Sequence, residues 1–74
     1  MNLTDVPEKT TVIISAMPLN PRVIGKLSQL GIRLGSEVRV DRFAPFGGPV
    51  MICVDNREVA LGKKLARKIE VENV

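Results

Sequence analysis

The second half of the chain is a succession of short segments in which apolar and polar residues alternate. Val38 and Val40 alternate with charged residues, and Val59 and Leu61 lie two residues apart further along. A period of two places the apolar side chains on one face of a half-buried strand. Four strands are therefore predicted from residue 37 onward, at residues 37–43, 50–54, 57–61 and 69–72. The turn signals between them predict antiparallel neighbours joined by short connections.

The first half predicts one more strand and one helix. Residues 10–15 are rich in β-branched side chains, which favour a strand. Asn20 is a good helix N-cap, and Pro21 occupies the first helical position, where the missing N–H of proline costs nothing. Gly31 is expected to end the helix in a left-handed conformation. The apolar residues between these signals recur at helical spacing and form one stripe: Val23, Ile24, Leu27 and Leu30.

Five short strands and one short helix in 74 residues predict a mainly β fold. A small sheet protects its edges by curling, so we expect a single domain, residues 1–74, built as a partly open β-barrel with the helix at one end. Residues 62–66 are expected to be a connector of about one helical turn. The predicted core consists of Val12, Ile14, Val23, Leu27, Leu30, Val38, Val40, Ile52, Val54, Val59, Leu61, Ile69 and Val71.

The composition removes several classes of function. Histidine is absent, so the usual general base and the commonest neutral metal ligand are missing. Cys53 is the one cysteine, which excludes an internal disulfide and favours a reducing compartment. Cys53 is interpreted as an inert, outward-facing strand residue. We expect no catalytic residues, no metal site and no cofactor. No apolar run is long enough to span a membrane, and the polar, acidic N-terminus does not resemble a signal peptide, so a cytoplasmic location is predicted.

Two loops are the candidate partner-binding segments. One is the hairpin loop Pro45, Phe46, Gly47, Gly48 and Pro49, in which a large apolar ring lies between residues typical of a turn. The prolines limit the backbone entropy that is lost when such a loop binds. The alternative for Phe46 is that it folds back as a lid over the end of the barrel. The second candidate is the proline-rich loop that carries Met17 and Leu19, which is also expected to be exposed.

One basic cluster remains to be interpreted, at Lys63, Lys64, Arg67 and Lys68. The net charge is +3, which permits an anionic partner without requiring one. No aromatic residue lies among these cations, and Glu70 and Glu72 follow directly, so a solvated connector is the favoured interpretation. Two alternatives stay open. One is a small nucleic-acid-binding barrel that uses this cluster on phosphates. The other is self-association through the exposed hairpin.

The order of these features resembles the FeoA family. The resemblance rests on the helix end Leu27-x-x-Leu30-Gly31-Ile32-x-x-Gly35, the strand at Glu37, the loop 44–49 and the strand that ends in Val59-Ala60-Leu61. It extends from about residue 3 to residue 71 and implies an SH3-like barrel. Iron-dependent repressors of the diphtheria-toxin repressor type carry a related C-terminal domain after a DNA-binding helix-turn-helix. Residues 1–74 contain no predicted helix-turn-helix, so we do not expect a transcription factor.

The resemblance also implies a role in bacterial ferrous-iron uptake. Members are small cytosolic accessory proteins that act by protein contact beside FeoB, a membrane transporter with a cytosolic G-protein domain, which would recruit this chain to the inner face of the membrane. Two departures from the family pattern affect the expected contact. The start of the helix carries fewer basic residues than is usual, and Gly62 follows Leu61 where an arginine is common.

Overall fold

The computed structural model describes residues 1–74 and contains five strands, two α-helices and one 3-10 turn. The bounds of three strands and the start of the long helix agree with the sequence prediction. The connector after the fourth strand forms the helical turn that was expected there, and a 3-10 turn near the N-terminus was not predicted. In chain order the elements are η1 (Leu3–Asp5), β1 (Thr10–Ala16), α1 (Pro21–Gln29), β2 (Glu37–Phe43), β3 (Val50–Val54), β4 (Arg57–Leu61), α2 (Lys63–Ala66) and β5 (Glu70–Asn73).

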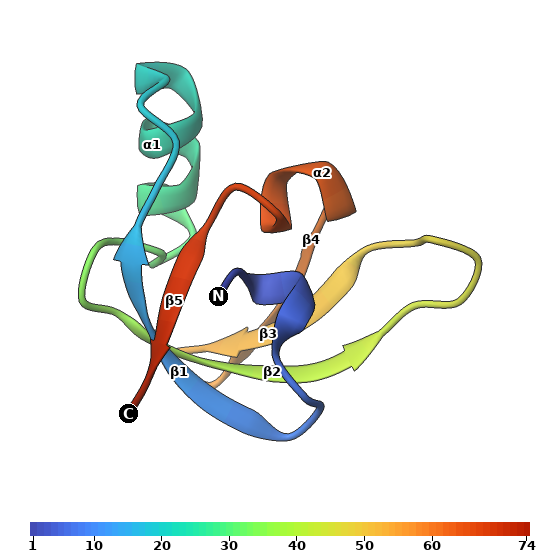
Figure 1. Ribbon diagram of the computed structural model, residues 1–74. Helices are drawn as coiled ribbons and strands as arrows, with labels where there is room; N and C mark the ends of the chain where they lie inside the picture. Colours follow the sequence, from blue (N-terminus) through green and yellow to red (C-terminus); the bar gives the residue numbers. More distant parts are fainter.

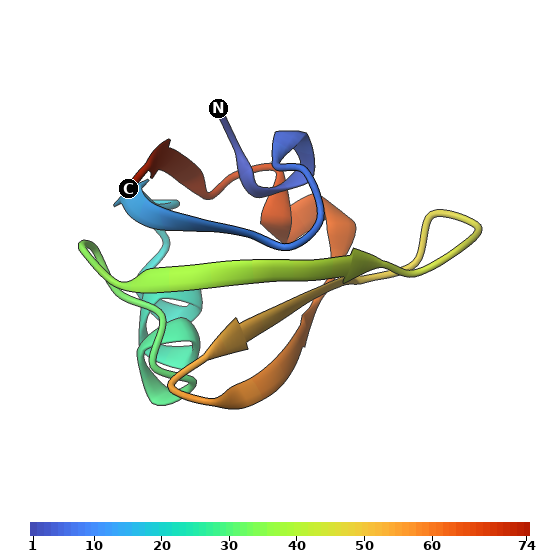
Figure 2. The same ribbon diagram turned by 90° about the horizontal axis from the view of Figure 1, so that it is seen from below.

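The strands form one antiparallel sheet in the order β4-β3-β2-β1-β5. No ladder joins β4 to β5, so the curled sheet stays open between these two edge strands, as the partly open barrel prediction requires (Figures 1 and 2). Two register shifts interrupt the ladders, one between Ile14 and Ala16 and one between Val40 and Arg42. Such bulges bend a strand and increase its twist, which helps a small sheet to curl.

One apolar core lies inside the curled sheet, and no polar or charged side chain is buried in it. Ten of the predicted core residues are buried. Val23, Leu30 and Val59 are only half-buried and pack against the edge of the core. Five buried residues escaped the prediction, namely Leu3, Val6, Ile32, Val50 and Ala66.

Local chemistry sets both ends of α1. The side chain of Asn20 accepts a hydrogen bond from the backbone N–H of Arg22 at 3.0 Å, and Pro21 is the first helical residue. After the last turn Gly31 adopts a φ of 88°, and the N–H of Ile32 returns to the carbonyl of Leu27. Ile32 is then buried. Only Leu27 of the helix itself is fully buried, so α1 stands partly clear of the sheet (Figure 1).

Candidate functional site

The hairpin loop between β2 and β3 holds Phe46 entirely in solvent. The N–H of Gly48 donates to the carbonyl of Pro45 at 3.1 Å, and Phe46 and Gly47 between them have φ values of 59° and 71°. Positive φ is unfavourable for a bulky residue, so the turn presents the ring at a cost in backbone strain. Phe46 is fully exposed. The alternative in which Phe46 closes the end of the barrel is therefore wrong.

The loop before α1 contributes to an apolar groove on the outer side of that helix, which we call the outer groove. Its volume is about 400 Å³. Leu19 is 92% exposed and Leu34 is 66% exposed, whereas Met17 is half-buried and packs against the core. The expectation of exposure therefore holds for Leu19 and fails in part for Met17. The groove is lined by Met17, Leu19, Ile24, Ser28, Ile32, Arg33 and Leu34.

Arg33 fixes one wall of the outer groove. Its Nε donates to Ser28 Oγ and its Nη2 donates to the carbonyl of Ser28, both at 3.1 Å. The guanidinium thus satisfies a carbonyl near the C-terminal end of α1, where positive charge is favoured by the helix dipole. This arrangement ties the segment at Arg33 to α1, so that Leu34 and Ile24 line the same groove.

The two predicted partner-binding segments lie on opposite sides of the molecule. In both ribbon views α1 and the loop before it lie at one end, and the β2–β3 loop projects from the other (Figures 1 and 2). The molecule measures 29 × 26 × 23 Å, so Leu19 and Phe46 form two separate surfaces rather than one site.

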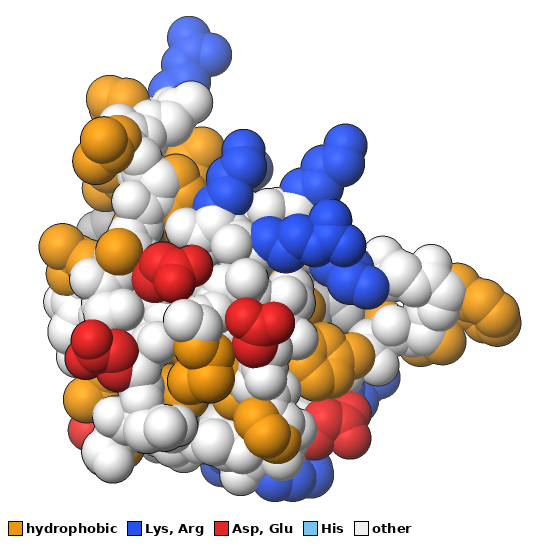
Figure 3. Space-filling model, in the orientation of Figure 1, with side chains coloured by type: hydrophobic (Ala, Val, Ile, Leu, Met, Phe, Trp, Pro, Cys, Tyr) orange, Lys and Arg blue, Asp and Glu red, His pale blue; other side chains and the backbone are white.

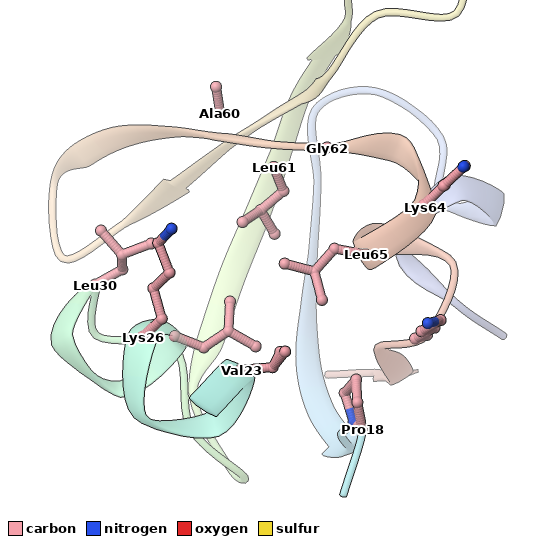
Figure 4. A pocket seen from close by; sticks show the side chains of 11 residues that line it. Pro18, Val23, Lys26, Leu30, Ala60, Leu61, Gly62, Lys64 and Leu65 are labelled. Carbon is pink, nitrogen blue, oxygen red and sulfur yellow. The ribbon is translucent and has the colours of Figure 1, made fainter. Parts of the chain in front are cut away.

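A second groove lies between α1 and α2, which we call the lysine groove. Its volume is about 510 Å³. Val23, Leu61 and Leu65 point into it from α1, β4 and α2, as Figure 4 shows. The charged residues that line it are Lys26, Lys64 and Lys68. In the space-filling view, basic side chains gather over this end of the molecule, whereas acidic ones lie nearer β5 (Figure 3). The sequence predicted the basic cluster but not the groove.

The outer face of the sheet carries a polar pair beside Cys53. Asp41 occupies the bulge of β2 and accepts a hydrogen bond from Arg39 Nε at 2.6 Å. This hydrogen bond lowers the pKa of Asp41. Partial burial of the carboxylate raises the pKa and so opposes the hydrogen bond, whereas the positive charge of Arg39 lowers it further. Cys53 is half-buried opposite Arg39 and Glu58 on the neighbouring strands, so it faces outward as expected.

The structure offers no group of three or more Asp, Glu, Cys or His side chains placed to hold a metal ion together. None of its helices has the length and apolarity needed to cross a bilayer. What the molecule does present is three distinct surfaces, the Phe46 loop, the outer groove and the lysine groove.

The comparison with known protein families decides the identity of the fold. The model of the FeoA domain matches residues 1–73. The chain belongs to the FeoA family. The family is associated with ferrous-iron transport, and its members share the small SH3-like β-fold that the structure has. No curated protein matches the chain.

Several solved structures superpose on the whole chain. One is the iron(II) transport protein A from Clostridium thermocellum, at 30% identity and a TM-score of 0.92; the chain spans 46% of that protein's length. Another is a FeoA described as an iron uptake regulatory protein, at 24% identity and a TM-score of 0.89, of which the chain covers 97%. The manganese-activated repressor ScaR has the same fold in 35% of its length, at 24% identity and a TM-score of 0.89.

Proposed function

We propose that the chain is a non-catalytic accessory protein of ferrous-iron uptake that binds the cytosolic domain of the FeoB transporter. Membership of the FeoA family supports the connection with ferrous iron. The absence of histidine supports action by contact rather than by general acid–base chemistry. A cytoplasmic location follows from this role.

The observation that carries the proposal is the concentration of exposed apolar side chains on the outer groove. Six large apolar side chains are exposed in the molecule, and three of them, Leu19, Ile24 and Leu34, line this groove. Scattered apolar residues are normal on a protein surface, but a cluster around a recess is typical of a binding site. We therefore assign the main contact to the outer groove, with Met17 and Leu19 at its edge.

The loop Pro45, Phe46, Gly47, Gly48 and Pro49 is proposed as a second, separate contact. Its ring is held in solvent by a turn that is unfavourable for phenylalanine, and strained positions of this kind concentrate at functional sites. A single partner that touched both surfaces would have to wrap around the molecule.

A calorimetric titration with the isolated cytosolic domain of the transporter tests this assignment. Leu19→Asp and Leu34→Asp are expected to weaken the affinity about tenfold or more, because each removes a leucine side chain from the contact. Val74→Asp is the matched control, since Val74 is also apolar and exposed but lies outside both grooves. Phe46→Asp tests the second contact in the same way. Unchanged affinity in both leucine variants would contradict the assignment of the outer groove.

A further inference from the structure

The lysine groove has features that the proposed transporter contact does not use. It lies on the other side of α1 from the outer groove, and no residue lines both. None of the six exposed large apolar side chains lines it. Its apolar surface is recessed, contributed by half-buried Val23, Leu30 and Leu65 and by buried Leu27 and Leu61.

All the charged side chains that line this recess are positive. Lys26, Lys64 and Lys68 line it from both helices, and no aspartate or glutamate does. The structure contains two ion pairs, one between the N-terminus and Glu70 and one between Arg39 and Asp41, so none of these lysines is neutralised within the molecule. Lys63 and Arg67 of the same cluster extend the basic surface beyond the groove.

We propose that the lysine groove is a docking site for an acidic amphipathic segment of a partner protein. Such a segment would place two or three apolar side chains against Val23, Leu61 and Leu65 and would set carboxylates beside the three lysines. An amphipathic helix in an apolar groove is a recurrent mode of peptide recognition. Charge complementarity at the rim adds specificity and speeds association.

The shape of the groove favours a peptide over the two other anionic partners. A membrane-binding surface inserts protruding apolar side chains, and none of the exposed large apolar residues lines this groove. Single-stranded nucleic acid stacks its bases on aromatic rings, and both aromatic residues of the chain, Phe43 and Phe46, lie outside the groove. A narrow ligand with its own apolar face fills the recess as well as pairing with the lysines.

Fluorescence provides a direct assay because the protein has no tryptophan. The probe is a synthetic amphipathic peptide of about 15 residues, with leucines and one tryptophan on one face and glutamates beside them. A peptide with lysines in place of the glutamates is its control. We expect the glutamate peptide to bind, more weakly at high salt, and the lysine peptide not to bind. Failure of the glutamate peptide to bind would overturn the proposal.

Charge-reversal variants locate the binding. The double variant Lys64→Glu, Lys68→Glu is expected to weaken peptide binding about tenfold or more. The double variant Lys63→Glu, Arg67→Glu makes the same change in net charge outside the groove lining, and it is expected to change the affinity less than about twofold. If this control weakens binding as much as the first double variant, the effect comes from overall charge, and the proposed site is wrong.

Two further probes complete the test. Anionic lipid vesicles and single-stranded DNA are titrated in the same buffer. If either binds more tightly than the glutamate peptide and depends on Lys64 and Lys68, the groove serves a membrane or nucleic acid, and the proposal fails. The transporter domain takes no part in these measurements, so their outcome is independent of the proposed contact at the outer groove.

Discussion

At the scale of single residues, positive φ marks the positions where backbone conformation limits the choice of side chain. Gly31 ends α1 with a φ of 88°, and a Cβ built there would lie 2.9 Å from Asp55 Oδ2 and 3.3 Å from Val54 Cγ1. Gly31 was predicted to end the helix because glycine can adopt the left-handed conformation that closes a helix C-terminus. The contact with Asp55 could not be predicted, since it joins residues that are distant in the sequence.

Gly31→Ala is expected to lower the free energy of unfolding by about 1–3 kcal/mol, because alanine is strained at this φ and crowds the β3–β4 turn. Gly25→Ala is the matched comparison. Gly25 lies inside α1, and a Cβ there would meet no atom within 4 Å. Alanine should stabilise α1 by about 0.5–1 kcal/mol at that position. Urea denaturation of both variants checks that the two changes in the free energy of unfolding have opposite signs. A loss of stability in Gly25→Ala would contradict this account of α1.

At the scale of elements, the limits of prediction follow from how far apart the interacting residues lie. Local signals in the sequence predict three strands and the start of α1 well. Apolar and polar residues alternate in the strands at 37–43, 50–54 and 57–61, and a capping residue precedes the helix. The 3-10 turn was missed although part of its basis is local, a capping box between Asn2 and Asp5. Long-range hydrogen bonds then hold the turn in place. Leu3 N–H donates to the carbonyl of Ile69, and Val71 N–H donates to that of Met1. Burial of Leu3 and Ala66 depends on this meeting of the two ends of the chain.

The attachment of α1 depends largely on one side chain, because Leu27 is its only fully buried residue. Leu27→Ala should cost about 2–5 kcal/mol, a large part of the stability of so small a domain. Because Leu27 lines the lysine groove and anchors the helix that also lines the outer groove, the variant should loosen both of them. Amide hydrogen exchange provides the measurement. We expect faster exchange in α1 than in β2 and β3; uniform protection in the variant would show that other contacts hold the helix.

At the scale of the whole molecule, the fold separates three surfaces that the sequence could not place relative to one another. The Phe46 loop extends from one side, and α1 divides the outer groove from the lysine groove on the other. Met17 and Leu19 were predicted as binding residues from the composition of their loop. Their neighbour Leu34 was not, because it joins them only when the chain returns after α1. The lysine groove was missed for the same reason, since its walls come from residues 23–30 and 60–68.

The central claim is that the outer groove is the surface through which this FeoA-family chain binds the cytosolic domain of FeoB. An NMR titration of the isotope-labelled chain with that unlabelled domain tests it most directly, because it reports on every surface at once. The account predicts that the largest amide shift changes cluster at Leu19, Ile24 and Leu34, with a second set around Phe46. Changes confined to other surfaces, or none at all, would contradict it.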